Sequence, residues 1–311
     1  MLKKSQYSPV NVKKILFITL SNIGDAILTT PTIQAIHLKY PNAVIDIVGD
    51  ARSRIIFLHC PYMGKFYEKK KQSGWLGVIA LLRILRRTNY DIAIDLRSDG
   101  LLYLIKAKFK IFKLLNKSTL SMHSVEKHFF SLKEIVKPTI PGLKIWLSKK
   151  EKMKANKLLK EFKNKKILAL GLGANYDGKI WPTSSFLELA NQLEKYFDLI
   201  LLLGSKEDNK RSSVFIKNYS GAVIDCAGIY SILETTALLE RSTFFVGNDS
   251  GLGHMASAVN TPSFTVFGIG EPWRYRPWGN KALWHQDSNN NIGAIPGSLV
   301  ANVIIKQLKL D

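Results

Sequence analysis

Short apolar runs alternate along the chain with longer segments in which apolar residues recur every three to four positions. The short runs predict strands at 15–19, 44–48, 92–95, 167–170, 199–203, 244–246 and 263–267. The longer segments predict helices near 26–39, 75–87, 184–196, 208–217, 231–240 and 253–259. This alternation is typical of an α/β protein in which helices cover parallel sheets.

The alternating pattern occurs once in each half of the chain. With 311 residues the chain is long enough for two cores. We therefore expect two doubly wound domains, 1–150 and 151–311, joined near a charged helical stretch at 148–162. The sequence leaves open whether the last helix packs back on the first domain. Ligands are expected at the carboxyl ends of the strands.

Cysteines and apolar segments narrow the class of protein further. Cys60 and Cys226 lie far apart and match no disulfide or zinc pattern, which fits a reducing compartment. The apolar run near the N-terminus, 15–20, is too short for a signal peptide or a membrane span. We expect a cytoplasmic protein without a transmembrane helix.

The net charge of +21 is concentrated in the first half of the chain. Residues 1–165 carry 32 Lys and Arg against 11 Asp and Glu, whereas residues 166–311 carry 13 of each kind. Such a field attracts polyanions or anionic lipid surfaces. Because no nucleic-acid-binding motif accompanies the charge, we expect no nucleic acid partner.

The segment V-G-N-D-S-G-L-G-H, 246–254, joins a predicted strand to a predicted helix. Free amides in the first turn of that helix suit phosphate oxygens. Gly251 would let a ligand approach the backbone, Ser250 can donate its hydroxyl, and His254 follows one turn later. The alternative is an ordinary Asp249 or Ser250 helix cap.

A second glycine-rich loop, G-L-G-A-N-Y-D-G-K-I-W-P, follows the strand at 167–170. Its Lys179 is the only lysine between Lys166 and Lys195 and is placed to neutralise a diphosphate. The loop matches neither the dinucleotide fingerprint nor the P-loop. Taken alone, Lys179 is better explained as a solvated loop residue.

A third junction follows the first strand, L-S-N-I-G-D-A-I-L-T-T-P, 20–31. Gly24 allows the turn and Asp25 begins the helix. A carboxylate there can act as a general base toward a sugar hydroxyl, or can simply complement the helix N-terminus.

Together these motifs resemble glycosyltransferase family 9, whose best-known members are the lipopolysaccharide heptosyltransferases. The matching stretches are I-G-D-A-I-L-T-T-P, then G-K-I-W-P with F-L-E-L-A, then N-D-S-G-L-G-H-M-A-S-A-V-N-T-P with F-T-V-F-G. Their order and separation extend the resemblance over nearly the whole chain. It implies a GT-B fold of two Rossmann-like domains and an inverting transfer that needs no metal and no cofactor. The chain also lacks a D-x-D triplet.

The resemblance assigns roles residue by residue. Asp25 matches the catalytic base and Lys179 the lysine that contacts donor phosphate. Acidic side chains at Glu207 or Asp208 match the place where the family binds the ribose, although each is equally explained as a helix N-terminal acid. The implied donor site comprises Gly24, Asn175, Lys179, Glu207, Asp208, Asp249, Ser250, Gly251, Leu252 and His254.

Some positions depart from the family's pattern. Ile180 and Thr19 stand where the family often has basic residues, and K-I-F-K-L-L-N replaces an Arg-x-Gly motif. These positions leave open which sugar is transferred.

Lysines in the same region predict a surface of the first domain. Lys106, Lys110, Lys113 and Lys117 have the spacing of one helix face, opposite Leu101, Leu102, Ile105, Phe109 and Phe112. A basic amphipathic helix of this kind can lie on an anionic bilayer, or can bury its apolar face in the core. The predicted acceptor or membrane surface comprises Arg97, Lys106, Lys110 and Lys113.

These observations predict a heptosyltransferase that uses ADP-heptose and an anionic lipopolysaccharide inner-core acceptor, either Kdo or heptose. The alternative is the same fold and chemistry with another nucleotide sugar or glycan acceptor. We expect the enzyme to contact the inner face of the inner membrane peripherally.

Overall fold

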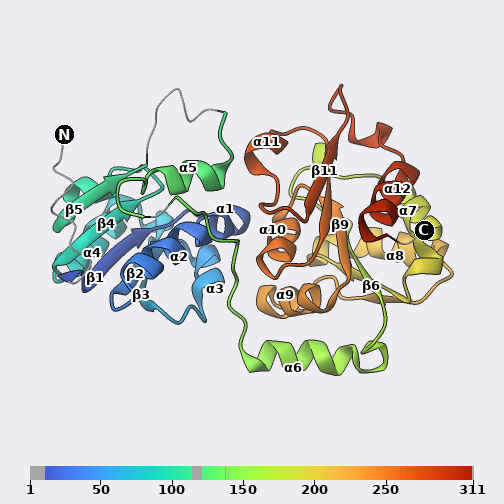
Figure 1. The fold of residues 1–311 in the computed structure, drawn as a ribbon, viewed down its shortest axis with the longest axis horizontal. Helices are drawn as coiled ribbons and strands as arrows, with labels where there is room; N and C mark the ends of the chain where they lie inside the picture. Colours follow the sequence, from blue (N-terminus) through green and yellow to red (C-terminus); the bar gives the residue numbers. More distant parts are fainter. Residues whose placement is uncertain (1–10, 114–120, 137, 310–311) are drawn as a thin grey trace. The chain divides into compact units, whose positions relative to one another are not determined.

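A computed structural model describes residues 11–113, 121–136 and 138–309. The chain forms two compact units that divide between Trp146 and Leu147 (Figure 1). Each unit is built around a parallel sheet with helices on both faces. In both units the described strands follow the order 3-2-1-4-5 of a Rossmann-like sheet, and the second unit adds a sixth strand at the far edge.

The sheet of the first unit has the order β3-β2-β1-β4-β5. Its strands are β1 (Lys14–Ile18), β2 (Val44–Gly49), β3 (Met63–Glu68), β4 (Tyr90–Asp95) and β5 (Ala107–Phe112). Its helices are α1 (Ile23–Leu28), α2 (Thr30–Lys39), α3 (Ala51–Phe57), α4 (Gly74–Leu85) and α5 (Ser124–Phe130), with short 3-10 turns η3 (Lys71–Ser73) and η4 (Leu101–Leu104). Leu16 and Ile18 of β1 pack against α4 and η4 on one face of the sheet.

The helix predicted near 26–39 is interrupted at Thr29, where α1 ends and α2 begins. Pro31 causes the interruption because it has no amide hydrogen to give to the carbonyl of Ile27. The hydroxyl of Thr30 donates to that carbonyl at 2.7 Å. A second hydroxyl contact, between Thr19 and Thr29 at 2.8 Å, ties this break to the end of β1.

The predicted amphipathic helix that carries Lys106, Lys110 and Lys113 is wrong. The segment instead forms η4 and the edge strand β5, which pairs with β4 in parallel register. Lys108 and Lys110 alternate with Phe109 and Ile111, which is strand periodicity. A helix would leave Lys108 off the lysine face and would forgo the bonds to β4. Lys117 lies outside the described residues.

The sheet of the second unit has the order β11-β10-β9-β6-β7-β8. Its strands are β6 (Ile167–Gly171), β7 (Leu199–Leu203), β8 (Val223–Asp225), β9 (Phe244–Asn248), β10 (Ser263–Phe267) and β11 (Ala282–Gln286). Its α-helices are α6 (Lys149–Leu158), α7 (Thr183–Leu193), α8 (Asn209–Asn218), α9 (Ile232–Arg241), α10 (Gly251–Ala258), α11 (Pro272–Tyr275) and α12 (Gly297–Leu308). Its described 3-10 turns are η6 (Lys160–Phe162), η7 (Asp177–Lys179), η8 (Glu194–Tyr196), η9 (Lys206–Asp208) and η10 (Ile292–Ala294).

Two helices at the ends of the second unit pack within it. The charged helix α6 begins at a capping box of Ser148 and Glu151 and lies along α9 (Figure 1). Lys152 pairs with Glu240 of α9 at 2.8 Å. The last helix, α12, packs against α7 through Val300, Ala301 and Ile304 and contributes to the same core.

Cys60 and Cys226 are buried and carry free thiols, as the sequence predicts. Among the described residues no helix combines the length and the apolar character that a bilayer crossing needs.

His128 makes the stability of the first unit depend on pH. Burial, followed by the charge of Lys113, lowers the pKa of its imidazole from 6.5 to about 3. The unfolded chain therefore binds this proton at a higher pH than the folded chain, and stability falls as the pH drops below 6.5. We expect a loss of about 2 kcal/mol between pH 7.5 and pH 5.

Urea unfolding at the two pH values, with His128→Gln as the comparison, measures this loss. The variant should show a shallower decline in stability. An equal decline in both proteins would assign the pH dependence to other groups.

Candidate functional site

Candidate residues of the second unit gather where the strand order reverses, between β6 and β9. Gly171 and Gly247 stand opposite each other at the ends of these strands. A Cβ atom on Gly268, which follows β10, would collide with the carbonyl oxygen of Gly178. The absence of side chains lets the loops after β6 and β10 approach closely.

Lys179 and Asp249 meet at this junction. Lys179 ends η7 in the loop after β6, and its Nζ lies 2.5 Å from Oδ2 of Asp249, which follows β9. Both side chains are largely shielded from solvent. The ion pair holds the lysine ammonium near the start of α10, and two of its three N–H donors have no partner among the residues that the structure describes.

Ser250 stands at the N-cap position of α10 without capping it. Its backbone is extended, and its side chain makes no hydrogen bond to the helix. The Ser250 Oγ atom is buried and has no hydrogen-bond partner among the described residues. The amides of Gly251, Leu252 and Gly253 occupy the first turn, where helical geometry gives them no partner. A buried hydroxyl beside free amides suits a bound anion.

His254 is also brought to this helix, where it is buried one turn from Ser250. Asn175 lies exposed in the loop after β6. Both residues thus belong to the segments that follow β6 and β9.

Asp208 and Glu207 have different surroundings. Asp208 is buried and accepts hydrogen bonds from the backbone and hydroxyl of Ser205 at 2.9 and 3.0 Å. A Cβ atom on Gly173 would collide with this carboxylate, which therefore fixes the neighbouring loop. In the structure, Asp208 occupies the position of a helix N-terminal acid, one of the two roles that the sequence left open. The Glu207 carboxylate is exposed, and a hydrogen bond from Ser205 lowers its pKa.

Asn248 is a positioning residue that the sequence analysis missed. It is fully buried, and its Oδ1 accepts the amide of Trp181 at 3.0 Å. Its Nδ2 donates to the carbonyls of Gly171 and Gly173 at 3.4 and 3.3 Å. Asn248 thereby joins the end of β9 to both ends of the lysine loop. The sequence feature that could have identified Asn248 is its place in the N-D-S-G motif.

Replacing Asn248 with Ala should lower the free energy of unfolding by about 1–3 kcal/mol, because it leaves the buried Trp181 amide unsatisfied. Chemical denaturation measures this loss. Asn191→Ala, on the exposed side of α7, is the matched control and should change little. Equal stability of the two variants would remove the role assigned to Asn248.

Asp25 lies in the first turn of α1, at the carboxyl end of β1 in the first unit. Asn22, at the N-cap, makes no capping bond through its side chain; its Nδ2 instead donates to Oδ2 of Asp25 at 3.1 Å. The Asp25 carboxylate remains partly exposed, and Gly24 precedes it. The local fold thus presents an oriented carboxylate at the switch point between β1 and β4.

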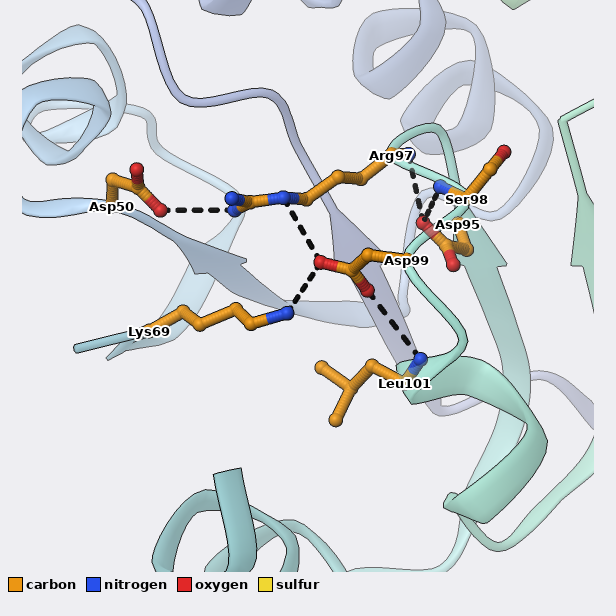
Figure 2. Close-up of polar contacts among 7 residues, drawn as sticks. All are labelled: Asp50, Lys69, Asp95, Arg97, Ser98, Asp99 and Leu101. Carbon is orange, nitrogen blue, oxygen red and sulfur yellow. Dashed lines mark hydrogen bonds and ion pairs between the residues drawn. The ribbon is translucent and has the colours of Figure 1, made fainter. Parts of the chain in front are cut away.

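Arg97 forms the centre of a charged cluster at the carboxyl ends of the strands of the same sheet (Figure 2). Its NH1 lies 2.9 Å from Oδ1 of Asp50, and its Nε lies 2.9 Å from Oδ2 of Asp99. Lys69 also pairs with Asp99. These residues follow β2, β3 and β4, so three strand ends converge on the guanidinium. Sequence reasoning selected Arg97 but not the other three.

Asp95, the last residue of β4, fixes the loop that carries Arg97. Its Oδ1 accepts the amides of Arg97 and Ser98 at 2.7 and 2.9 Å (Figure 2). Burial raises the pKa of Asp95. Lys113 follows β5 at the same end of the sheet, where its amide donates to the Asp95 carbonyl at 2.9 Å. Lys106 precedes β5 at the opposite end, so the predicted lysines do not form one cluster.

A hollow of about 530 Å³ adjoins the Arg97 cluster and shares Asp50 and Lys69 with it. It is lined by Asp50, Ala51, Arg52, Glu68, Lys69, Lys70, Gln72 and Ser73. Three cations and two carboxylates in this lining suit a ligand with several hydroxyls and a negative charge.

Comparison with known proteins matches the chain to one protein family. A family model for glycosyltransferase family 9 (heptosyltransferase) matches residues 78–292. The chain is 25% identical over 290 residues to lipopolysaccharide heptosyltransferase 3 of Escherichia coli K12, covering 82% of each chain.

Solved structures show the same fold. A glycosyl transferase family 9 protein from Veillonella parvula superposes with a TM-score of 0.86 at 18% identity, covering 96% of this chain and 98% of that one. Escherichia coli heptosyltransferase WaaC, solved with ADP, gives a TM-score of 0.74 at 18% identity, covering 94% and 99%. WaaC has also been solved with ADP-2-deoxy-2-fluoro heptose. The fold is GT-B, as predicted. The chain belongs to glycosyltransferase family 9, the heptosyltransferase family.

Proposed function

We propose that this protein transfers a heptose from ADP-heptose to an anionic inner-core acceptor of lipopolysaccharide, either Kdo or heptose. Family membership and the activities named for its relatives support this reaction. The observation that carries the donor assignment is the buried Ser250 hydroxyl at the first turn of α10, beside Lys179. This hydroxyl has no hydrogen-bond partner within the described part of the chain. ADP bound to the relative WaaC favours adenine as the base.

The donor diphosphate would bind at the start of α10. The amides of Gly251 and Leu252 and the Ser250 hydroxyl would donate to phosphate oxygens, and the helix dipole would favour their negative charge. Lys179 would stabilise the charge that grows on ADP as it leaves. Glu207, the exposed acid after β7, would accept from a ribose hydroxyl.

Asp25 would act as the general base in the transfer. The acceptor hydroxyl oxygen would bond to the anomeric carbon while the bond from that carbon to the ADP oxygen breaks. The hydroxyl proton would go to the Asp25 carboxylate, and the bonding electrons would go to the diphosphate. Attack from the face opposite ADP inverts the anomeric configuration. The groups proposed here supply charge stabilisation and proton transfer without a metal or cofactor.

The hollow beside Arg97 is our candidate acceptor subsite. Arg97 and Lys69 are each paired with carboxylates, so an anionic acceptor would compete with Asp50 and Asp99 for them. Such competition favours ligands that offer more than one anionic oxygen. Because the acceptor of this reaction is anchored in a bilayer, we propose that the enzyme works at the inner face of the inner membrane.

Titration calorimetry with ADP, UDP, GDP and CMP tests the donor assignment. ADP should bind most tightly, and Ser250→Ala should weaken its binding. Preference for another nucleotide would support the same chemistry with a different donor and contradict ADP-heptose. Salt-sensitive binding of nucleic acid without any nucleotide binding would overturn the enzyme assignment.

A further inference from the structure

The helix α4 is apolar on the side that faces solvent. Its sequence is G-W-L-G-V-I-A-L-L-R-I-L, and Leu81 and Leu85 are its buried residues. Trp75 is 74% exposed and Leu76 is 66% exposed. Large apolar side chains with this exposure, next to one another on one helix, are not explained by the core of the first unit.

The turn η4 extends the apolar surface of α4. Leu101 and Leu102 of η4 pack in the same core cluster as Leu81 and Leu85, so both elements cover one face of the sheet. Nε of Arg86, which follows α4, donates to the carbonyl of Leu104 at 2.9 Å. On the outside of η4, Tyr103 is 72% exposed and Leu104 is 48% exposed.

Basic residues surround these apolar side chains. In the sequence, residues 69–90 contain six Lys and Arg and no Asp or Glu, and residues 100–113 contain four and none. Arg83 and Arg87 are exposed. Arg83 lies seven positions after Leu76, on the same face of α4, and Arg87 lies just beyond the end of that helix. Nζ of Lys110 donates to the Tyr103 carbonyl at 3.1 Å, which brings β5 to the same surface.

We infer that this docking face binds an anionic phospholipid bilayer. The docking face comprises Trp75, Leu76, Tyr103 and Leu104 with Arg83, Arg87, Lys106 and Lys110. Trp and Tyr favour the interface between lipid headgroups and acyl chains, and aliphatic side chains beside them bury apolar area there. Lys and Arg at the rim are attracted by anionic headgroups.

Charge favours a bilayer over a second copy of the chain on the docking face. A symmetric dimer through this face would bring two arrays of arginine and lysine together, and like charges at short range repel. Asp91, which pairs with Lys108 at 2.8 Å, offsets the charge of one neighbouring lysine, but α4 itself contains no acidic residue. Anionic lipid supplies the opposite charge over the whole face.

The docking face begins where the candidate acceptor hollow ends. Gln72 and Ser73 line the hollow, and Trp75 follows two residues later. A lipid-anchored acceptor can place its sugar in the hollow while its acyl chains stay in the bilayer. This use of the docking face rests on the proposed function. The inference that the docking face binds lipid does not itself depend on the reaction.

Sedimentation with vesicles of phosphatidylethanolamine and phosphatidylglycerol tests this inference with the full-length protein. The double variant Trp75→Ser with Leu76→Ser should bind at least about tenfold more weakly, since two interfacial side chains are lost. The matched control is Leu38→Ser with Met153→Ser, which removes side chains that are 74% and 69% exposed elsewhere. The control should bind like the original protein.

Charge is tested by Arg83→Gln with Arg87→Gln, which should weaken binding by roughly fivefold for each arginine. Phosphatidylcholine vesicles should bind the original protein weakly. Equal vesicle binding by the Trp75 and Leu76 double variant and its control would overturn the inference. Light scattering that shows a dimer which the same double variant dissociates would also overturn it.

ADP titration of each variant separates this inference from the proposed function. The original protein and the three double variants should all bind ADP equally, because none of the replaced residues belongs to the junction between β6 and β9 in the second unit. Loss of vesicle binding with intact ADP binding supports the docking face. Failure of ADP to bind the original protein would contradict the proposed donor while leaving the vesicle result to decide the docking face.

Discussion

Replacement of Asp25 by asparagine is expected to lower kcat for heptosyl transfer by about 10²- to 10⁴-fold. Asparagine keeps the size of the side chain but cannot accept the proton of the attacking hydroxyl. Asn22 holds the carboxylate in one orientation at the start of α1, so the loss should reflect chemistry rather than local unfolding. Steady-state kinetics with ADP-heptose and a Kdo-terminated acceptor measures the effect.

The control for Asp25 is Glu134→Gln, which neutralises an exposed carboxylate in the same unit. It should leave kcat unchanged, and both variants should bind ADP like the original protein. Near-normal turnover by the Asp25 variant would remove the proposed base. Loss of ADP binding by that variant would show that its effect is not confined to proton transfer.

Replacement of Lys179 by alanine is expected to lower kcat/KM by about 10²- to 10³-fold, the cost of deleting one preorganised donor that faces developing charge. The same variant should bind ADP more weakly but adenosine equally, because adenosine has no phosphate for the lysine to contact. Calorimetry with both ligands measures the difference. Lys195→Ala, at an exposed lysine of the same unit, should behave like the original protein.

The ion pair with Asp249 requires a further control for Lys179. Removing the ammonium leaves a largely shielded carboxylate without its partner, which can weaken ADP binding through repulsion. Lys179→Ala combined with Asp249→Asn removes that charge. If the double variant regained full affinity for ADP, the lysine would serve to neutralise Asp249 rather than to bind phosphate.

The central strands of both sheets could be predicted because they are buried on both faces and read as continuous apolar runs. The edge strands β3, β5, β8 and β11 escaped prediction. Each has one side without a neighbouring strand and carries polar or partly exposed residues, as in K-F-K-I-F of β5. Their strand conformation depends on pairing with a neighbour distant in sequence, which local periodicity does not report.

The candidate site was predictable to the extent that its residues follow strand ends in compact motifs. The N-D-S-G junction and the lysine loop fell on the reversal point of the second sheet for that reason. Contacts between different loops produce no compact motif in the sequence that could predict them. Asn248 bridges two strands, and Asp50, Lys69 and Asp99 meet Arg97 from separate segments, so their roles appear only in the folded chain.

Asp208 shows the opposite limit of sequence reasoning. Its position matched a ribose-binding acid, yet the chain uses both carboxylate oxygens internally, toward Ser205 and Arg211. A capping box and a ligand-binding acid require the same residue type at the same place. Because Asp208 is buried and Glu207 is exposed, we propose Glu207 for the ribose contact.

Mass spectrometry of a Kdo-terminated lipid acceptor, after incubation with ADP-heptose and the protein, tests the proposed transfer most directly. The acceptor should gain the mass of one heptosyl residue, and this gain should disappear with the Asp25 variant. An acceptor of unchanged mass, while the same protein transfers a sugar from a different nucleotide donor, would contradict it.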